Sequence, residues 1–209
     1  MGLSAEHITA GLDALAAREP GVARALALAG YPAPRIRERG AATLLRTIVG
    51  QQVSVAAAAS VWARLEAGLG GAPGQGVPLA AVLAADDETL RSFGLSRQKA
   101  GYARSLAQLV LSGGLDFAAL PADDEEAIAL LTQIKGIGRW SAEIYLLFAE
   151  GRPDVWPAGD LAVQAGLHKI LALPERPSEK ATRAMAEAWR PHRGALALFT
   201  WHCYNNAAL

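Results

Sequence analysis

The feature that most constrains this fold is the segment 133–142, where two glycines separate two helical patterns. Upstream, Asp123 is placed to cap a short helix, with Glu126 three residues further on as its capping-box partner. Downstream, residues 141–148 carry the apolar spacing of a second helix. The connection Gly136-Ile-Gly138 is too short for side-chain chemistry of its own, so the pattern predicts a tight hairpin of two helices.

The two glycines of this hairpin can adopt positive φ and let another molecule approach the backbone closely. Bare N–H groups at the start of a helix, together with the helix dipole, attract an anion such as a phosphate. The same spacing also fits an ordinary helical hairpin that binds nothing. The rest of the chain must therefore decide between the two interpretations.

An all-α fold is predicted for the whole chain, because apolar residues recur at helical spacing and no strand pattern is present. A Gly- and Pro-rich connector is expected at residues 70–78. The other helices are expected near residues 6–17, 21–28, 41–50, 54–69, from 86 or 87 to 94, from 96 onward, 161–171, 179–189 and 193–205.

Composition limits the setting of the protein. With 209 residues, of which 52% are hydrophobic, the chain can bury a core as one domain or as two closely packed lobes. One cysteine, Cys203, excludes a disulfide framework and a cysteine-ligated cluster, and it is expected to be buried. No leader pattern and no membrane-length apolar run is present, so we expect an intracellular protein, cytoplasmic or associated with the nucleoid.

Basic and acidic residues balance at 20 each, which is unusual for a nucleic-acid-binding domain. Acids gather at 86–88 and 123–126. The bases lie elsewhere, at Arg35, Arg37, Arg39, Arg97, Lys99, Lys135 and Arg139, and only the last four of these lie in or beside the segment 94–100 and the hairpin, where phosphates would bind. Segregation of this kind can offset a neutral total, although any single one of these side chains also fits an ordinary solvated face.

Asp160 lies between Pro157 and a helical pattern that begins at Leu161. This spacing predicts a helix N-cap. The same position also suits a carboxylate that faces a groove and takes part in chemistry. The two roles are compatible.

Five motifs in order resemble the helix-hairpin-helix DNA glycosylases, and within them the alkyl-base branch, the 3-methyladenine DNA glycosylase II type in its compact form. Together they span about residues 40–205. They are Ile48-Val-Gly-Gln-Gln-Val-Ser-Val55, Gly94-Leu-Ser-Arg-Gln-Lys-Ala100, the hairpin, Val155-Trp-Pro-Ala-Gly-Asp-Leu161 and Trp189-Arg-Pro-His-Arg193.

The resemblance implies a single glycosylase domain, residues 1–209, of two packed helical lobes with the active-site groove between them. One lobe would hold about 40–115, and the other about 1–39 with 116–209. The implied partner is damaged double-stranded DNA, bound by a monomer. The implied reaction flips out an alkylated purine, of the 3-methyladenine or 7-methylguanine type, and hydrolyses its N-glycosidic bond to leave an abasic site.

The family's catalytic aspartate falls on Asp160. A carboxylate there would stabilise the oxocarbenium-like sugar that forms as the bond breaks, and it could orient the attacking water. Relatives with lyase activity carry a lysine nucleophile where this chain has Trp140, so the resemblance implies a monofunctional enzyme. Trp140 and Trp201 match the aromatic residues of the base pocket, whereas spacing alone makes Trp201 equally a core residue.

For DNA binding, the resemblance implies the hairpin residues Gly136, Gly138 and Arg139, with Ser96 and Lys99 at the earlier junction. A side chain from the turn after the helix 41–50 would fill the hole left by the flipped base, and Gln51 and Gln52 are the candidates. No cofactor is implied apart from a structural monovalent cation, held by the backbone carbonyls of Thr132, Ile134 and Ile137.

Two positions depart from the family pattern. Ile144 replaces a pocket tyrosine of some members, and Gly159 replaces a second acid. Both leave the range of lesions open, so a glycosylase for deaminated bases is one alternative. A non-catalytic helix-hairpin-helix module that only grips DNA is the other, and it would need the hairpin but not Asp160, Trp140 and Trp201 together.

Overall fold

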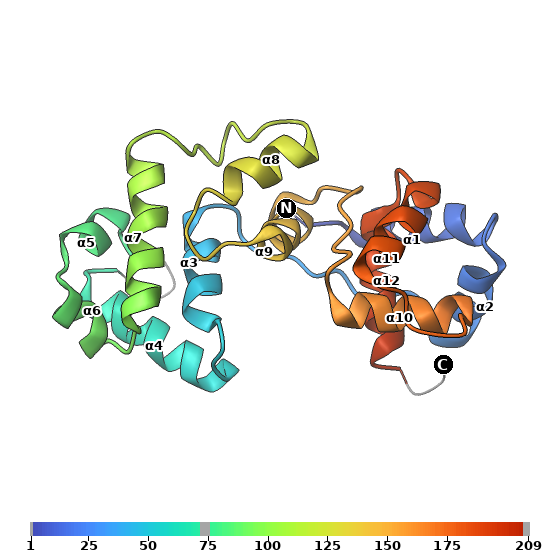
Figure 1. Ribbon diagram of the computed structural model, residues 1–209, viewed down its shortest axis with the longest axis horizontal. Coiled ribbons are helices and arrows are strands. Elements are labelled where there is room, and N and C mark those ends of the chain that lie inside the picture. Colours follow the sequence, from blue (N-terminus) through green and yellow to red (C-terminus); the bar gives the residue numbers. More distant parts are fainter. Residues whose placement is uncertain (1, 72–75, 207–209) are drawn as a thin grey trace. The chain divides into compact units, whose positions relative to one another are not determined.

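The computed structural model describes residues 2–71 and 76–206, and every regular element among them is a helix. Figure 1 shows these helices joined by connections without regular secondary structure, among them a long one between α7 and α8. The prediction of an all-α fold is confirmed. Part of the connector expected at 70–78, residues 72–75, lies outside the described residues.

The chain divides into two compact units, one made of residues 1–37 with 143–209 and the other of residues 38–142. The division differs from the expected lobes chiefly in the segment 116–142, which groups with the middle of the chain. Hydrogen bonds explain this grouping, because Arg39 donates to the Phe117 carbonyl and the Lys135 amide donates to the Ser105 hydroxyl.

The unit formed by residues 38–142 is built around its longest helix. That helix, α7, packs against α3, α5 and α6. Helix α5 was not predicted from the sequence. The helices of this unit are α3 (Ala41–Gly50), α4 (Val55–Gly68), α5 (Leu79–Ala84), α6 (Asp87–Ser92), α7 (Arg97–Leu111), α8 (Asp124–Leu131) and the start of α9 (Arg139–Tyr145).

Side-chain caps fix the starts of four helices in this unit. The side chains of Ser54, Asp86, Ser96 and Asp123 each accept a hydrogen bond from the amide three residues further on. Each bond satisfies an amide that the first helical turn leaves without a partner. The positions at which α4, α6, α7 and α8 begin are therefore local properties of the sequence.

The second unit joins the N-terminal helices to the C-terminal part of the chain. Helix α10 packs against α12, and both contact α2. A Cβ at Gly166 of α10 would lie 2.1 Å from the Thr200 carbonyl oxygen of α12, so only glycine permits this close approach. The helices are α1 (Ala5–Ala16), α2 (Pro20–Ala29), α10 (Leu161–Leu171), α11 (Glu179–Ala186) and α12 (Arg193–Tyr204), with the 3-10 turn η2 (Glu187–Trp189).

The helix after the hairpin glycines begins at Arg139, two residues before the predicted start. It continues from α9 into a π-helical turn, η1 (Leu146–Glu150), which ends at Gly151 in the left-handed conformation. Such π-helical turns are rare and often lie at functional sites. Phe148 of this turn is one of the buried residues of the second unit's core.

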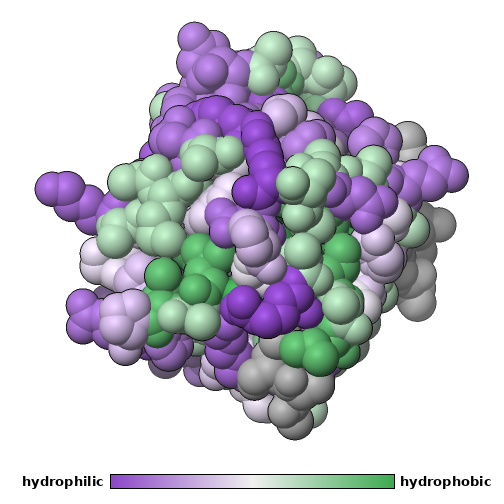
Figure 2. Space-filling model, turned by 90° about the vertical axis from the view of Figure 1, so that its right-hand side faces the viewer, coloured by the Kyte–Doolittle hydropathy of each residue, from purple (hydrophilic) through white to green (hydrophobic). Residues whose placement is uncertain are grey.

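On the surface that Figure 2 shows, hydrophobic residues form small groups separated by hydrophilic ones. In the described part of the chain, no helix has both the length and the apolar character needed to cross a membrane.

Candidate functional site

Asp160 is the N-cap of α10, as its position in the sequence predicts. Its Oδ1 atom accepts hydrogen bonds from the amides of Ala162, at 2.8 Å, and Val163, at 3.0 Å. The side chain is neither fully buried nor fully exposed. The helix start thus fixes the direction of the carboxylate and stabilises its negative charge.

A third donor reaches the same oxygen from a distant part of the chain. The indole N–H of Trp201, on α12, donates to Asp160 Oδ1 at 3.2 Å. Trp201 is only 6% exposed, and its ring lies 5.4 Å from that of Phe148. The Arg35 guanidinium lies 5.3 Å from the Trp201 ring centroid. Trp201 therefore both orients the carboxylate and belongs to the core.

Helix α12, which carries Trp201, is anchored at its first residue. The buried Arg193 side chain donates from Nε to Asp154 Oδ1 at 2.9 Å and from Nη2 to Asp154 Oδ2 at 3.0 Å. Asp154 also accepts from Arg190 at 2.6 Å. A two-pronged arginine–carboxylate pair defines geometry as well as energy, so the motif Trp189–Arg193 positions the helix.

Trp140, the other aromatic predicted for a base pocket, lies on α9 in the unit formed by residues 38–142. It is 47% exposed, an unusual state for an indole of this size. Asp160 and Trp201 are brought together within the other unit, whereas Trp140 belongs to a separate one.

The hairpin has two glycines with different surroundings. Gly136 has φ +83°, and a Cβ there would lie 2.1 Å from Cδ2 of Tyr102. Among the described residues, nothing lies within 4 Å of a Cβ built at Gly138. Gly136 is thus required by its own backbone conformation and packing, whereas Gly138 leaves open space beside the backbone.

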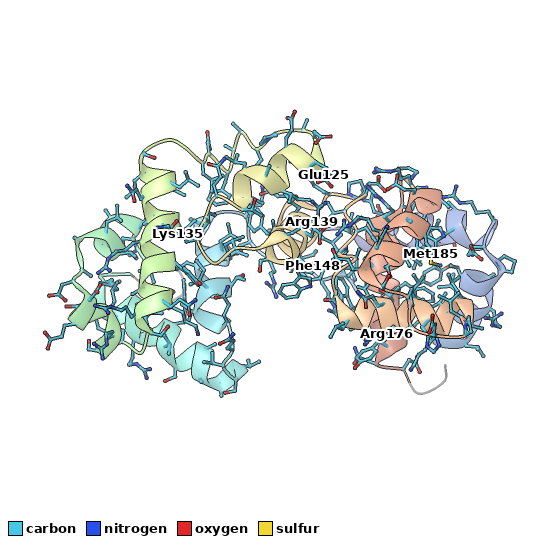
Figure 3. All side chains as sticks on the ribbon, in the orientation of Figure 1. Glu125, Lys135, Arg139, Phe148, Arg176 and Met185 are labelled. Atoms are coloured by element: carbon cyan, nitrogen blue, oxygen red, sulfur yellow. The ribbon has the colours of Figure 1, made fainter. Side chains whose placement is uncertain are left out.

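Arg139 follows the hairpin and forms a two-pronged ion pair with Glu125 of α8, at 2.5 and 2.8 Å. Figure 3 shows the two labelled side chains on neighbouring helices. Both are well exposed, and exposed ion pairs contribute only about 0–1 kcal/mol.

Next to Gly136 there is a pocket of about 320 Å³. Gln51 has a fixed position in the wall of this pocket, because the Gln51 side-chain amide donates to the Gly136 carbonyl at 2.8 Å. Gln52 is exposed and has φ +54°, which is unfavourable for a residue with a Cβ. The pocket is lined by Gln51, Gln52, Val53, Ser96, Gln98, Lys99, Tyr102 and Gly136.

Ser96 and Lys99, predicted at the earlier junction, both line this pocket, and both also have structural partners. The Ser96 hydroxyl caps α7 by accepting from the Lys99 amide at 3.2 Å. The Lys99 ammonium donates to the Val49 carbonyl at 2.8 Å, and desolvation lowers the pKa of Lys99. Each keeps a further donor, since a hydroxyl has one hydrogen and an ammonium three.

Four residues near these sites were not recognised from the sequence as part of them. Tyr102 packs on Gly136, and its hydroxyl accepts from Gln98 at 2.5 Å. Phe148 and Arg35 cover Trp201. A helical spacing of four between Gln98 and Tyr102 could have linked that pair. No sequence signal joins Arg35 to a ring at position 201.

The carbonyls expected to hold a monovalent cation lie in the turn between α8 and α9. One of them, Ile134 O, already accepts from the Ile137 amide at 3.0 Å, although a carbonyl oxygen has a second lone pair. In residues 2–71 and 76–206 no group of three or more histidine, cysteine or acidic side chains is placed to hold a metal. Cys203 is buried, as expected, and burial raises the pKa of its thiol to about 12.

Comparison with known proteins extends these observations. A family model described as HhH-GPD superfamily base excision DNA repair protein matches residues 45–191. The DNA-3-methyladenine glycosylase 1 of Schizosaccharomyces pombe is 33% identical over 160 residues, which cover 76% of this chain and 69% of that protein. The DNA-3-methyladenine glycosylase 2 of Escherichia coli is 31% identical over 165 residues, covering 76% of this chain and 55% of the longer relative.

The fold resembles a solved structure over nearly its whole length. The Schizosaccharomyces pombe 3-methyladenine DNA glycosylase, in complex with abasic DNA, aligns with a TM-score of 0.80 and 29% identity. The alignment covers 95% of this chain and 98% of that one. Both the helical architecture and the order of the elements are thus shared.

Proposed function

Because the chain belongs to the HhH-GPD superfamily of base excision DNA repair proteins, we propose that it is a DNA glycosylase for alkylated purines. It hydrolyses the N-glycosidic bond of 3-methyladenine- and 7-methylguanine-type bases and leaves an abasic site. The names of its relatives in fission yeast and Escherichia coli support this substrate class. The observation that carries the proposal is the carboxylate of Asp160, oriented by two helix amides and an indole.

Asp160 supplies the catalytic charge. Cleavage of an N-glycosidic bond leaves an oxocarbenium-like sugar, and a preoriented carboxylate stabilises that cation without reorganising during the reaction. The same group can orient or deprotonate the attacking water. A purine alkylated at N3 or N7 already carries positive charge and leaves readily. One carboxylate without a strong general acid is then sufficient.

Water, rather than an amine, is the nucleophile in this proposal. Trp140 occupies the position that holds the lysine of lyase-competent members, and an indole cannot form a Schiff base. Lys135 lies on the other side of the hairpin glycines and does not take this role. The enzyme is therefore monofunctional, and DNA strands break only after alkali acts on the abasic site.

In this proposal, Trp140 and Trp201 are the aromatic residues that contact the flipped base. An electron-rich indole attracts a cationic alkyl-purine through a cation–π interaction, on the order of 0.5–2 kcal/mol. This attraction discriminates a charged, damaged purine from a neutral one. The exposure of Trp140 suits a side chain that receives a flipped base.

Replacing Trp201 with phenylalanine is expected to lower the single-turnover rate of methylated-purine release about 10-fold, because it removes a hydrogen bond to a charged group. Trp156→Phe is the matched control: the Trp156 indole N–H is also buried but has no hydrogen-bond partner within the described residues. The rates of both variants would be measured on methylated duplex DNA at saturating protein. Equal losses in the two variants would mean that ring volume matters and the bond to Asp160 does not.

The DNA backbone is bound at the hairpin. The open space beside Gly138 lets a phosphate approach the amides at the start of α9, which has a favourable dipole for an anion. Arg139 leaves Glu125 to pair with a phosphate, and the Ser96 hydroxyl and Lys99 ammonium supply further donors from the earlier junction. Such contacts position the duplex without reading its sequence.

Gln52 is the wedge that fills the hole left by the flipped base. Gln51 is committed to the Gly136 carbonyl, whereas Gln52 is exposed at a strained backbone position of the kind that collects at functional sites. Gln52→Ala is expected to lower release from duplex DNA about 10-fold and release from single-stranded DNA much less, because only the duplex must be unpaired. Gln51→Ala is the control. Loss of its hydrogen bond should lower the free energy of unfolding by about 1 kcal/mol, and any change in base release should be the same for duplex and single-stranded DNA. Equal behaviour of Gln52→Ala on the two substrates would contradict the wedge.

A monovalent cation is proposed at the carbonyls of Thr132, Ile134 and Ile137, where it would hold the turn in the shape that receives a phosphate. A bound ion stabilises the folded state by mass action. Potassium or sodium chloride is therefore expected to raise the melting temperature above that in tetramethylammonium chloride at equal ionic strength. Identical melting in all three salts would remove the cation from the proposal.

The partner in this proposal is damaged double-stranded DNA, and the protein acts as an intracellular monomer. Wild-type protein is expected to release 3-methyladenine and 7-methylguanine from methylated duplex DNA, with strand breaks only after alkali. Chromatography of the free bases is the measurement. Duplexes containing uracil or hypoxanthine test the alternative of a glycosylase for deaminated bases. Binding to DNA without release of any base would identify a DNA-binding module and contradict the proposed enzymatic activity.

A further inference from the structure

The segment between α2 and α3 has no regular secondary structure, yet its backbone is held in place. The Arg37 amide donates to the Phe148 carbonyl of η1 at 2.8 Å. A Cβ at Gly2 would lie 2.7 Å from the Phe148 carbonyl oxygen and 2.9 Å from that of Arg35, so the chain near Gly2 packs closely against both. The positions of Arg35 and Arg37 are thus set by the fold of their unit.

Both arginine side chains lie on aromatic rings. The Arg35 guanidinium carbon is 5.3 Å from the Trp201 ring centroid, and that of Arg37 is 5.6 Å from the Phe148 ring centroid. The two rings are themselves 5.4 Å apart. Since Trp201 also donates to Asp160, the two cations belong to the same cluster as the catalytic carboxylate.

Neither Arg35 nor Arg37 forms an ion pair with any acid in the described part of the chain. Other arginines of this unit do, as Arg183, Arg190 and Arg193 show. Partial desolvation and the nearby charge of Arg35 lower the pKa of Arg37. Two like charges held together beside apolar rings are unfavourable, and a bound anion would relieve their repulsion.

We propose that Arg35 and Arg37 form a binding site for a phosphodiester of the DNA strand that carries the lesion. The inference rests on the proposed function and adds a second backbone contact, on the unit that holds Asp160. Guanidinium groups match phosphate oxygens in two-pronged geometry. The phosphate that the pair binds belongs to the nucleotide at Asp160 or to its neighbour, because Trp201 contacts both Arg35 and Asp160.

Substrate charge gives a further reason for a phosphate at this place. A cationic alkyl-purine that stacks on Trp201 would be repelled by the Arg35 charge already on that ring. A phosphate that pairs with Arg35 neutralises this charge and can draw the guanidinium from the ring. Backbone binding and acceptance of a cationic base are then linked.

The salt dependence of DNA binding tests the site. The probe is a duplex with a tetrahydrofuran analogue of an abasic site, titrated by fluorescence anisotropy over a range of salt concentrations. Loss of one phosphate contact is expected to reduce the slope of log K against log salt by about 1 in Arg35→Gln and again in Arg37→Gln. Arg35→Lys and Arg37→Lys keep the charge and should keep most of the slope.

Arg176→Gln is the matched control. It removes the same charge from an exposed position of the same unit, and Figure 3 shows Arg176 apart from Phe148. Its slope should equal that of the wild type. Unchanged slopes in the Arg35 and Arg37 variants, or the same reduction in Arg176→Gln, would overturn the phosphate site.

Base release from methylated duplex, measured on the same preparations, separates this inference from the proposed function. If the wild type releases alkylated purines while the glutamine variants keep its slope, only the phosphate site fails. If the wild type binds DNA but releases no base, the proposed function fails. The slopes of log K against log salt still test the phosphate site in that case. Thermal melting of each variant confirms that it is folded.

Discussion

Asp160→Asn is expected to lower the single-turnover rate of methylated-purine release by about 100- to 1,000-fold. Asparagine caps helices as well as aspartate does, and its carbonyl oxygen can still accept from Ala162, Val163 and Trp201. The variant should therefore keep the fold, the position of the Trp201 ring and the affinity for DNA. What the substitution removes is the negative charge opposite the developing sugar cation.

Asp123→Asn is the matched control for this variant. Asp123 also caps a helix, with its Oδ1 accepting from the Glu126 amide at 2.9 Å, so the same chemical change is made at a second N-cap. Its rate should equal that of the wild type. Melting temperatures and DNA affinities of both variants should stay close to wild type. A rate for Asp160→Asn within a few-fold of wild type would mean that Asp160 only caps a helix and is not catalytic.

Gly136→Ala is expected to lower the free energy of unfolding by about 2–4 kcal/mol, because it combines an unfavourable left-handed backbone with overpacking. The positive φ penalises any side chain there, and the new Cβ would enter the space of the Tyr102 ring. For a chain of this length, such a loss lowers the melting temperature by roughly 5–15 °C. Thermal unfolding followed by circular dichroism is the measurement.

Gly138→Ala separates packing from DNA binding in the same hairpin. Among the described residues, nothing lies within 4 Å of the added methyl group, so stability should change by no more than about 0.5–1 kcal/mol. If a phosphate approaches this backbone, the methyl group should nevertheless weaken DNA binding at constant temperature. Unchanged binding by Gly138→Ala, with intact stability, would argue against a backbone phosphate contact at this glycine.

Much of the secondary structure could be predicted because its causes are local. The caps Ser54, Ser96 and Asp123 act on amides three residues away, so their effect can be recognised from a short window of sequence. Helix α5 was missed because six residues, Leu79–Ala84, are too few to show a helical period. The early start of α9, at Arg139, follows from the tight turn at Gly136, after which only Ile137 and Gly138 precede the helix.

The candidate site was predicted in its residues but not in its contacts. Asp160 was expected as a cap, and Trp201 was equally compatible with the core and the pocket. The choice between Gln51 and Gln52 was open, since both are amides at the same turn. The structure separates them, because only Gln51 bonds to Gly136.

By itself, the sequence determined the all-α class, most helix starts, the glycine hairpin and the role of Asp160 as a helix cap, since each depends on neighbours within about one helical turn. Only the tertiary structure decided that Trp201 holds Asp160, 41 residues away, that Gln51 reaches Gly136 across 85 residues, and that Arg35 covers Trp201. These contacts arise where helices pack. Packing brings together residues whose separation along the chain leaves no periodic signal.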